Sequence, residues 1–351
     1  MSSHYFCKLL ILGLLLSDPA AIQAASNTFS QINGPGALET MVNGINDHGQ
    51  IVGWYVHPDF TAQGFVYDNG TFAALDVPGA DVTFPLGINR HGQIVGWSQD
   101  SSGATESFLY DGAVLTLLNF PGSLATVVFG INESAAVVGW YVDSDNIARG
   151  FVYDEGTFTS LDVPGATFTS PRGINKRGQI VGWYSDSDFA THGFLYHQGE
   201  FTTLDVPGGG FTVAYGINDK GQIVGYSGDN RGFLYSKAGG FIALDVPGAL
   251  GTNPFGINDA GRVVGWYTDR PTDPDEPNLT CGFLARRTPR NTSNQQDIGL
   301  CAGHTEGLNL LTNQQLQPAN RGSSAVIDFI SRRVHPHSLH RSPDWILDPL
   351  L

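Results

Sequence analysis

The sequence predicts an all-β fold, a six-bladed β-propeller whose four-stranded blades stand in a closed ring. Three observations predict it: a triplet that recurs at a fixed spacing, turn motifs that recur with it, and an N-terminal segment that supplies a strand missing from the last repeat. The triplet Gly-Ile-Asn begins at residues 44, 87, 130, 173, 216 and 256, a spacing of 43 residues in four intervals and 40 in the last. A period of about 40 to 45 residues with strand-like content is typical of propeller blades, none of which can bury its faces alone.

Each repeat contains four short apolar stretches that we expect to be strands A, B, C and D. In the second repeat they run from Thr83 to Asn89, from Gln93 to Trp97, from Phe108 to Tyr110 and from Val114 to Leu118. No helical period is visible, and 43 residues are too many for one coil of a β-helix. A four-stranded blade therefore fits the repeat better than a solenoid does.

Three turn motifs separate these strands. The segment from Asn89 to Gly92 has Asn first and Gly fourth, as a type I turn prefers, and joins strands A and B. Asn-Gly between apolar runs, as in the segment from Asp68 to Gly70, predicts a hairpin between strands C and D. In the segment from Asp76 to Gly79, Pro and Gly predict a type II turn that ends strand D.

Strand B places large apolar residues on both of its faces, so both faces must be covered by neighbouring blades. Its aromatic residue recurs in every repeat, which favours a wedge between adjacent sheets, although such rings also suit a sugar site. These residues are Trp54, Trp97, Trp140, Trp183, Tyr226 and Trp266. The triplet asparagines are explained as the first residues of the A–B turns: Asn46, Asn89, Asn132, Asn175, Asn218 and Asn258.

The two ends of the array complement each other. The last repeat stops after strand C, at the segment from Gly282 to Leu284, while the segment from Phe29 to Gly36 resembles a strand D followed by its Pro-Gly turn. We therefore expect the N-terminal strand to complete the sixth blade and close the ring. Closure also removes the exposed sheet edges of an open array.

The regions outside the array suggest an exported protein. Residues 1–24 contain Lys8, an apolar run and small residues, which predicts a signal peptide ahead of a propeller spanning residues 25–287. Residues 288–351 lose the repeat and are expected to be a disordered or loosely attached tail. We expect secretion or a cell-surface location, with the periplasm as an alternative. Cys281 and Cys301 would then pair, unless they are two unrelated thiols.

Charge limits the partners of the chain. It has 33 acidic and 18 basic residues and a net charge of −15, which disfavours binding to nucleic acid and to anionic lipid headgroups. No stretch beyond the signal approaches 18 apolar residues, so membrane insertion is not expected. A soluble monomer that binds an extracellular glycan or protein fits these limits.

The repeat also resembles a known family. Gly-Phe-Leu-Tyr followed by Gly-Ile-Asn-x-x-Gly-Gln-Ile-Val-Gly is similar to the bacterial extracellular repeats called the HAF family, and the segment from Thr191 to Tyr196 comes closest to the motif behind that name. Gly replaces the family's Ala in most copies, and Asp-Val-Pro-Gly departs from its usual turn. The resemblance covers about 260 residues. It implies an exported or surface propeller-like protein and carries over no catalytic residue.

Length variation between repeats is confined to the loop between strands B and C, and variable loops on a rigid scaffold are where recognition usually lies. Most of these loops open with an acid, so we expect ligand-binding residues at the B–C rim: Asp100, Asp143, Asp186, Asp229, Asp269 and His57. The paired acids of two loops suit calcium: Asp143, Asp145, Asp186 and Asp188. The competing interpretation is that each aspartate caps its own turn.

No sequence motif predicts catalysis. The chain has no Gly-x-Ser-x-Gly elbow, no His-Glu-x-x-His and no Cys-x-x-Cys, so we predict no catalytic residue and no cofactor other than calcium. The leading hypothesis is a non-catalytic module that binds a glycan or protein through the B–C rim. The alternatives are a hydrolase or lyase of an extracellular polymer with a site at the channel mouth, and a purely architectural surface module.

Overall fold

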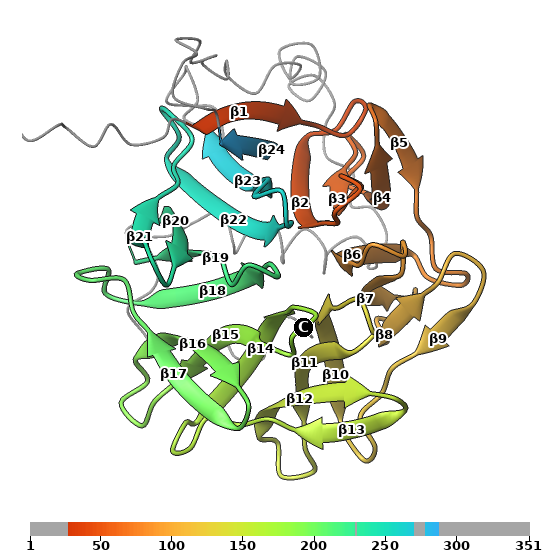
Figure 1. Cartoon of the computed structure of the whole chain (residues 1–351). Helices are drawn as coiled ribbons and strands as arrows, with labels where there is room; N and C mark the ends of the chain where they lie inside the picture. Colours follow the sequence, from red (N-terminus) through yellow and green to blue (C-terminus); the bar gives the residue numbers. More distant parts are fainter. Residues whose placement is uncertain (1–26, 229, 270–277, 288–351) are drawn as a thin grey trace, which may run out of the picture.

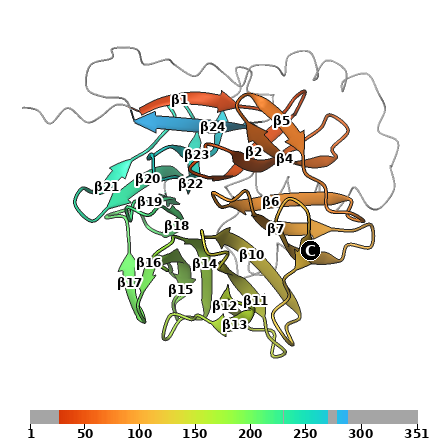
Figure 2. The same cartoon turned by 45° about the vertical axis from the view of Figure 1, so that its right-hand side comes forward.

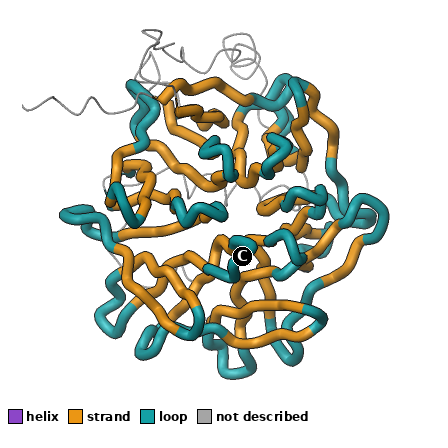
Figure 3. The backbone as a smooth tube through the Cα atoms, in the orientation of Figure 1, coloured by secondary structure: helices purple, strands orange, loops and turns teal. Residues whose placement is uncertain are grey.

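The computed structural model describes residues 27–228, 230–269 and 278–287, which form 24 β-strands and no helix (Figure 3). The predicted signal peptide (1–24), the predicted tail (288–351), Cys301 and Asp229 lie outside these residues. The strands form six separate four-stranded antiparallel sheets arranged in a ring, as predicted (Figure 1).

Each blade contributes one strand to each position from the axis outward, named A to D. The A strands are β2 (Glu39–Ile45), β6 (Val82–Ile88), β10 (Ala125–Ile131), β14 (Phe168–Ile174), β18 (Thr212–Ile217) and β22 (Gly251–Ile257). The B strands are β3 (Ile51–Val56), β7 (Ile94–Gln99), β11 (Val137–Val142), β15 (Ile180–Ser185), β19 (Ile223–Ser227) and β23 (Val263–Asp269). The C strands are β4 (Ala62–Asp68), β8 (Thr105–Tyr110), β12 (Ala148–Asp154), β16 (Thr191–His197), β20 (Arg231–Ser236) and β24 (Leu279–Arg287). The D strands are β5 (Thr71–Ala74), β9 (Leu115–Leu117), β13 (Thr157–Ser160), β17 (Glu200–Leu204), β21 (Gly240–Ala243) and β1 (Asn27–Ile32).

The N-terminal strand closes the ring, which confirms the prediction. β1 pairs antiparallel with β24, from Asn27 opposite Arg287 to Ile32 opposite Gly282. Figures 1 and 2 both show the two strands side by side at the outer edge of blade 6. Because β1 precedes blade 1 in the chain, the last sheet combines both ends of the array.

The hydrophobic core lies between the blades rather than at the axis. A strand-C phenylalanine is buried in every blade, and Phe65, for example, packs with Leu284 and Val264 of blade 6. The strand-B aromatics act as wedges, as predicted: Trp54 meets Phe84 of the next blade edge-on at 4.9 Å between ring centroids. Burial on both faces of each sheet explains the apolar composition of strand B.

The Gly-Ile-Asn triplet holds adjacent blades together. Its glycines lie where two A strands approach most closely, and a Cβ on Gly173 would stand 2.5 Å from the carbonyl oxygen of Tyr215. Only glycine fits such an approach without displacing backbone. The side-chain Oδ1 of each asparagine accepts at least one main-chain N–H of its own A–B turn, as in Asn175 with Arg177 and Gln179, each at 3.0 Å.

The same asparagines also form a ring that the sequence did not reveal. Each side-chain Nδ2 donates to the main-chain oxygen of the equivalent asparagine in the next blade, at 3.0 to 3.2 Å. The sixth asparagine donates back to the first, so the six bonds close on themselves. The asparagine is therefore both a turn former, as predicted, and a link between blades.

Candidate functional site

The B–C loops, where recognition was predicted, are compact turns wherever the structure describes the whole loop. In blades 1 to 4 the fourth loop residue donates its N–H to the carbonyl of the first, at 2.9 to 3.1 Å. A hydrogen bond from the first residue to the fifth residue's carbonyl, at 2.8 to 3.0 Å, closes each loop. These loops therefore hold their side chains at fixed positions on the rim that they share with the D–A connections.

The predicted aspartates of blades 2, 3 and 4 cap these turns. Oδ1 of Asp143 accepts the N–H groups of Asp145 and Ile147 at 3.0 and 2.9 Å, and Asp100 and Asp186 make the same pair of bonds in their own loops. The hydrogen bonds hold the pKa of each of these three carboxyls below its usual value, led by the side chain of Arg149 for Asp143. The competing interpretation, that the acid caps its turn, thus describes these loops.

The second oxygen of two aspartates has a basic side chain as its partner in the same blade. Asp143 Oδ2 lies 2.8 Å from Nε of Arg149, and Asp186 Oδ2 lies 3.3 Å from Nε2 of His192. Nδ1 of His192 lies 2.8 Å from Asp205, and although burial alone would lower the pKa of His192, its bonds to these acids raise it above the ordinary value.

Calcium remains a prediction. The described residues contain no group of three or more His, Cys, Asp or Glu side chains arranged to hold a metal ion.

The remaining predicted residues are placed differently. His57 starts the blade 1 loop with its ring 4.9 Å from Tyr55, and Asp59, which the sequence reasoning passed over, caps that turn through Thr61. Asp269 ends β23, and Asp229 lies outside the described residues. Asp100, Asp143 and Asp186 therefore each cap a turn of their own blade, and ligand binding by the acids of this rim stays a prediction.

The rim of the B–C loops and D–A connections carries most of the exposed large apolar side chains of the described chain. Of the eight large hydrophobic residues exposed in the described chain, five lie on B–C loops or D–A connections: Phe60, Leu124, Ile147, Phe189 and Leu250. Phe60 and Phe189 have positive φ angles of 65° and 61°. The same turn position holds Gly103 in blade 2 and Asn146 in blade 3, which adopt this conformation with less strain.

Residues at the axis differ from blade to blade, a feature that sequence reasoning missed. Every A strand has a β-bulge at the residue before the triplet, and the six residues there are Asn43, Leu86, Phe129, Arg172, Tyr215 and Phe255. The guanidinium carbon of Arg172 lies 3.7 Å from the ring centroid of Phe129 and 5.7 Å from that of Tyr215, which stacks on Phe255 at 4.0 Å. The set contains no carboxylate and no imidazole, so it does not supply the acid pair or acid–histidine pair that the enzyme hypothesis needs.

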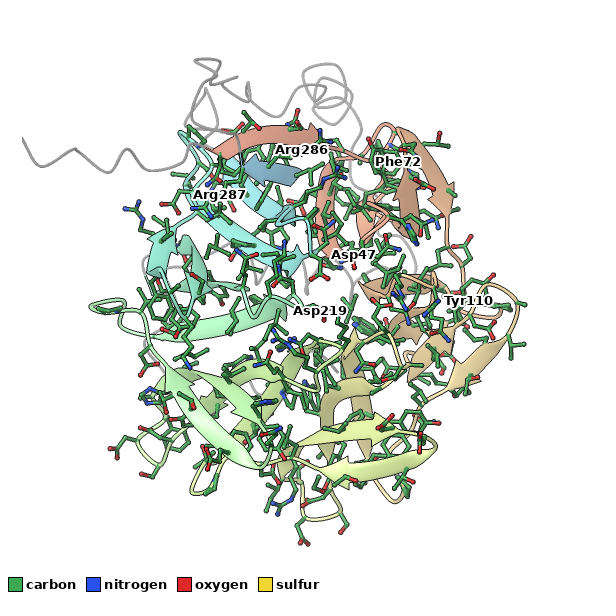
Figure 4. The ribbon with its side chains drawn as sticks, in the orientation of Figure 1. Asp47, Phe72, Tyr110, Asp219, Arg286 and Arg287 are labelled. Carbon is green, nitrogen blue, oxygen red and sulfur yellow. The ribbon has the colours of Figure 1, made fainter. Side chains whose placement is uncertain are left out.

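The opposite rim, formed by the A–B and C–D turns, carries charges that link blades. Asp259 donates its N–H to Oδ1 of Asp47 at 2.8 Å, and Asp219 donates to Oδ1 of Asp259 at 2.8 Å. Nζ of Lys176 lies 2.8 Å from Oδ2 of Asp219. Figure 4 shows Asp47 and Asp219 near the centre of the ring. These charges therefore reinforce the asparagine ring.

Cys281, on β24, is 1% exposed and disulfide-bonded, and its partner lies outside the described residues. None of the described residues forms a helix long and apolar enough to cross a membrane.

Comparisons with known proteins concern the fold. No protein-family model and no curated protein matches the chain. Among solved structures, SapL1 lectin in complex with α-methyl fucoside is 13% identical, with 66% of this chain and 88% of that chain covered and a TM-score of 0.42. TolB from Acinetobacter baumannii is also 13% identical, with 72% and 67% covered and a TM-score of 0.49. A fungal lectin from Aleuria aurantia, described as a six-bladed β-propeller, is 13% identical, with 59% and 77% covered and a TM-score of 0.39.

Proposed function

We propose that the chain is an exported, non-catalytic binding module that holds an extracellular protein or glycan against its B–C rim. The observation that carries this proposal is the pair Phe60 and Phe189, which are 42% and 61% exposed at positive φ. A bulky residue in this conformation costs about 1–3 kcal/mol. Both side chains keep a large part of their surface in solvent, so packing within the fold offsets the strain incompletely, and contact with a ligand gives them a role.

The distribution of the apolar residues favours a large ligand. Phe60 and Phe189 belong to blades 1 and 4, which stand on opposite sides of the ring, and Leu124 and Leu250 lie on the connections into blades 3 and 6. Aromatic and aliphatic side chains at these points suit the apolar face of a polymer or the surface of a folded protein. The negative net charge disfavours strongly anionic ligands.

The test compares the wild-type chain with a Phe60→Asn, Phe189→Asn double variant on a glycan array and on purified extracellular matrix and cell-wall polymers. Asn is the residue that Asn146 already provides at this position, so the variant keeps the turn. The matched control is Val114→Asn, which changes an apolar residue of 58% exposure on the opposite rim. We expect a ligand that the wild type and the control retain and that the double variant binds at least tenfold more weakly. Binding that is unchanged in the double variant, or absent in all three proteins, contradicts the proposal.

A further inference from the structure

A cavity of about 210 Å³ lies between blades 5 and 6 at the rim of the A–B turns, opposite the B–C loops. Its lining combines aliphatic side chains, here called the base (Leu234, Leu244, Val263 and Ala285), with polar ones, here called the mouth (Asn27, Lys220, Gln222 and Arg287). It is lined by Asn27, Lys220, Gln222, Leu234, Leu244, Ala260, Gly261, Val263, Ala285 and Arg287.

The cavity exists because blade 6 lacks a ring that every other blade has. Ala285 occupies the strand-C position held elsewhere by Tyr67, Tyr110, Tyr153, Tyr196 and Tyr235, each paired in register with a strand-B residue. At the seam between blades 4 and 5, Tyr235 and Leu195 pack against a buried cluster that contains Leu204. At the seam between blades 5 and 6, the equivalent Leu234 and Leu244 belong to a cluster in which Ala285 replaces the tyrosine. The space of one tyrosine side chain is left open.

The positive charge at the mouth of the cavity also sets blade 6 apart from blades 1 to 3. In blades 1 to 3 an aspartate follows the tyrosine, as Asp68 does in blade 1, whereas Arg286 and Arg287 follow Ala285. Figure 4 shows both arginines where β24 ends beside β1. Nζ of Lys220 donates to the main-chain oxygen of Asp259 at 2.7 Å. Within the described chain, neither Lys220 nor Arg287 forms an ion pair with a carboxylate.

We propose that this cavity binds a small aromatic carboxylate. The ring lies where the tyrosine of the other blades lies, against Leu234, Leu244 and Val263, and the carboxylate lies at the mouth beside Lys220 and Arg287. An apolar cavity of about 150 Å³ is large enough for benzene, so this volume accommodates one ring with its substituent. The aliphatic base offers no partners for the hydroxyls of a sugar, which would be costly to bury unpaired.

The test titrates benzoate into the full chain and follows binding by isothermal calorimetry and saturation-transfer NMR. Benzyl alcohol, which has the ring without the charge, is the control ligand. We expect benzoate to bind at least tenfold more tightly than benzyl alcohol, and its affinity to fall as salt screens the two cations. Equal affinity for the two ligands, or no benzoate binding, overturns the proposal.

Two variants locate the binding. Ala285→Tyr restores the residue of the other five blades, so we expect it to fold, to melt at a higher temperature because the cavity is filled, and to lose benzoate binding. Arg287→Gln should weaken binding about tenfold, whereas Arg90→Gln, a control at another seam, should leave it unchanged. Benzoate that binds Ala285→Tyr as well as the wild type shows that the cavity is not the site. The Phe60→Asn, Phe189→Asn variant should bind benzoate normally, which separates this site from the B–C rim.

Discussion

The side-chain amide of Asn258 donates a hydrogen bond of 3.0 Å to the main-chain oxygen of Asn46, a residue 212 positions earlier in the chain. This bond is the sixth of a ring in which every blade donates to the next. Both residues are buried, and the oxygen of Asn46 also accepts the N–H of Gly49 at 3.0 Å, so loss of the Asn258 amide removes one of its two donors where bulk water cannot replace it.

Asn258→Asp should therefore destabilise the fold by about 1–3 kcal/mol. The carboxylate can still cap its own turn, but it cannot donate to Asn46, and it places a negative charge beside a carbonyl oxygen. Guanidinium unfolding measures the effect. Asn119→Asp, the same change at an exposed position where four other blades have aspartate, is the control and should alter stability by less than about 0.5 kcal/mol. Equal effects of the two changes would show that the interblade bond does not stabilise the ring.

Ring closure predicts a large cost for a substitution in the first strand. Phe29 of β1 is 6% exposed and packs edge-on against Phe283 at 5.7 Å, so Phe29→Ala should cost about 3–5 kcal/mol. The neighbouring Ser30→Ala is the control, because Ser30 is exposed. If thermal unfolding of Phe29→Ala matches that of Ser30→Ala, β1 does not contribute to the stability of blade 6.

The strained turn of blade 4 predicts a stabilising substitution. Phe189→Asn should raise the free energy of unfolding by about 1 kcal/mol, because Asn tolerates positive φ better than Phe. Chemical denaturation at fixed pH tests this, with the neighbouring Asp188→Asn as the control. A loss of stability in Phe189→Asn would mean that Phe189 makes contacts that offset its strain.

Burial of Glu39 predicts a pH dependence. Burial raises the pKa of this carboxyl from 4.5 to about 7, so between these values the folded state keeps a proton that the unfolded state has lost. Stability contributed by the protonated group is complete below about pH 4.5 and is lost as pH rises to 7, with a total change of about 3 kcal/mol. Glu39→Gln should remove this dependence and stabilise the protein at pH 8. Glu106→Gln, at an exposed position, should keep the wild-type profile; identical profiles for both variants would contradict the assignment.

Calcium depletion provides a further test of the B–C loops. Since Oδ1 of Asp143 and of Asp186 is already bonded within its turn, we expect EDTA to leave the melting temperature unchanged. Differential scanning fluorimetry with and without millimolar calcium checks this. A rise in melting temperature with calcium that Asp186→Asn abolishes would support the metal site predicted from the acid pairs.

The repeat made the blades, their strand order and the closing strand predictable, because period and turn chemistry are local properties of the chain. Trp54 was predictable as a wedge for the same reason: an aromatic residue present in every blade is most simply explained by packing. The sequence could not show how closely the A strands of adjacent blades approach each other. The amide of Asn175 reaches the next blade only because glycine lets two A strands approach, and neither residue alone reveals that approach.

The candidate sites were harder to predict. Acids in the B–C loops suggested ligand binding, but an aspartate that caps a turn has the same sequence signal. The positions that revealed candidate sites were departures from the repeat whose side chains have no catalytic or metal-binding group. Ala285 indicates a cavity because the other five blades have a tyrosine at its position. Phe129 and Arg172 occupy equivalent positions at β-bulges, and a bulge is recognised from the pairing register of two strands rather than from the residues themselves.

The pairing of β1 with β24 also affects the order in which the blades fold during synthesis. Thr28 is among the first residues of the blades to be synthesised, yet it bonds to Arg286, 258 residues later. Five blades can assemble from neighbouring segments as they emerge, whereas the sixth waits for contacts of the greatest sequence separation, which form slowly. Nascent chains that end before Arg287 keep an unpaired strand edge, so they are the species most exposed to aggregation and proteolysis.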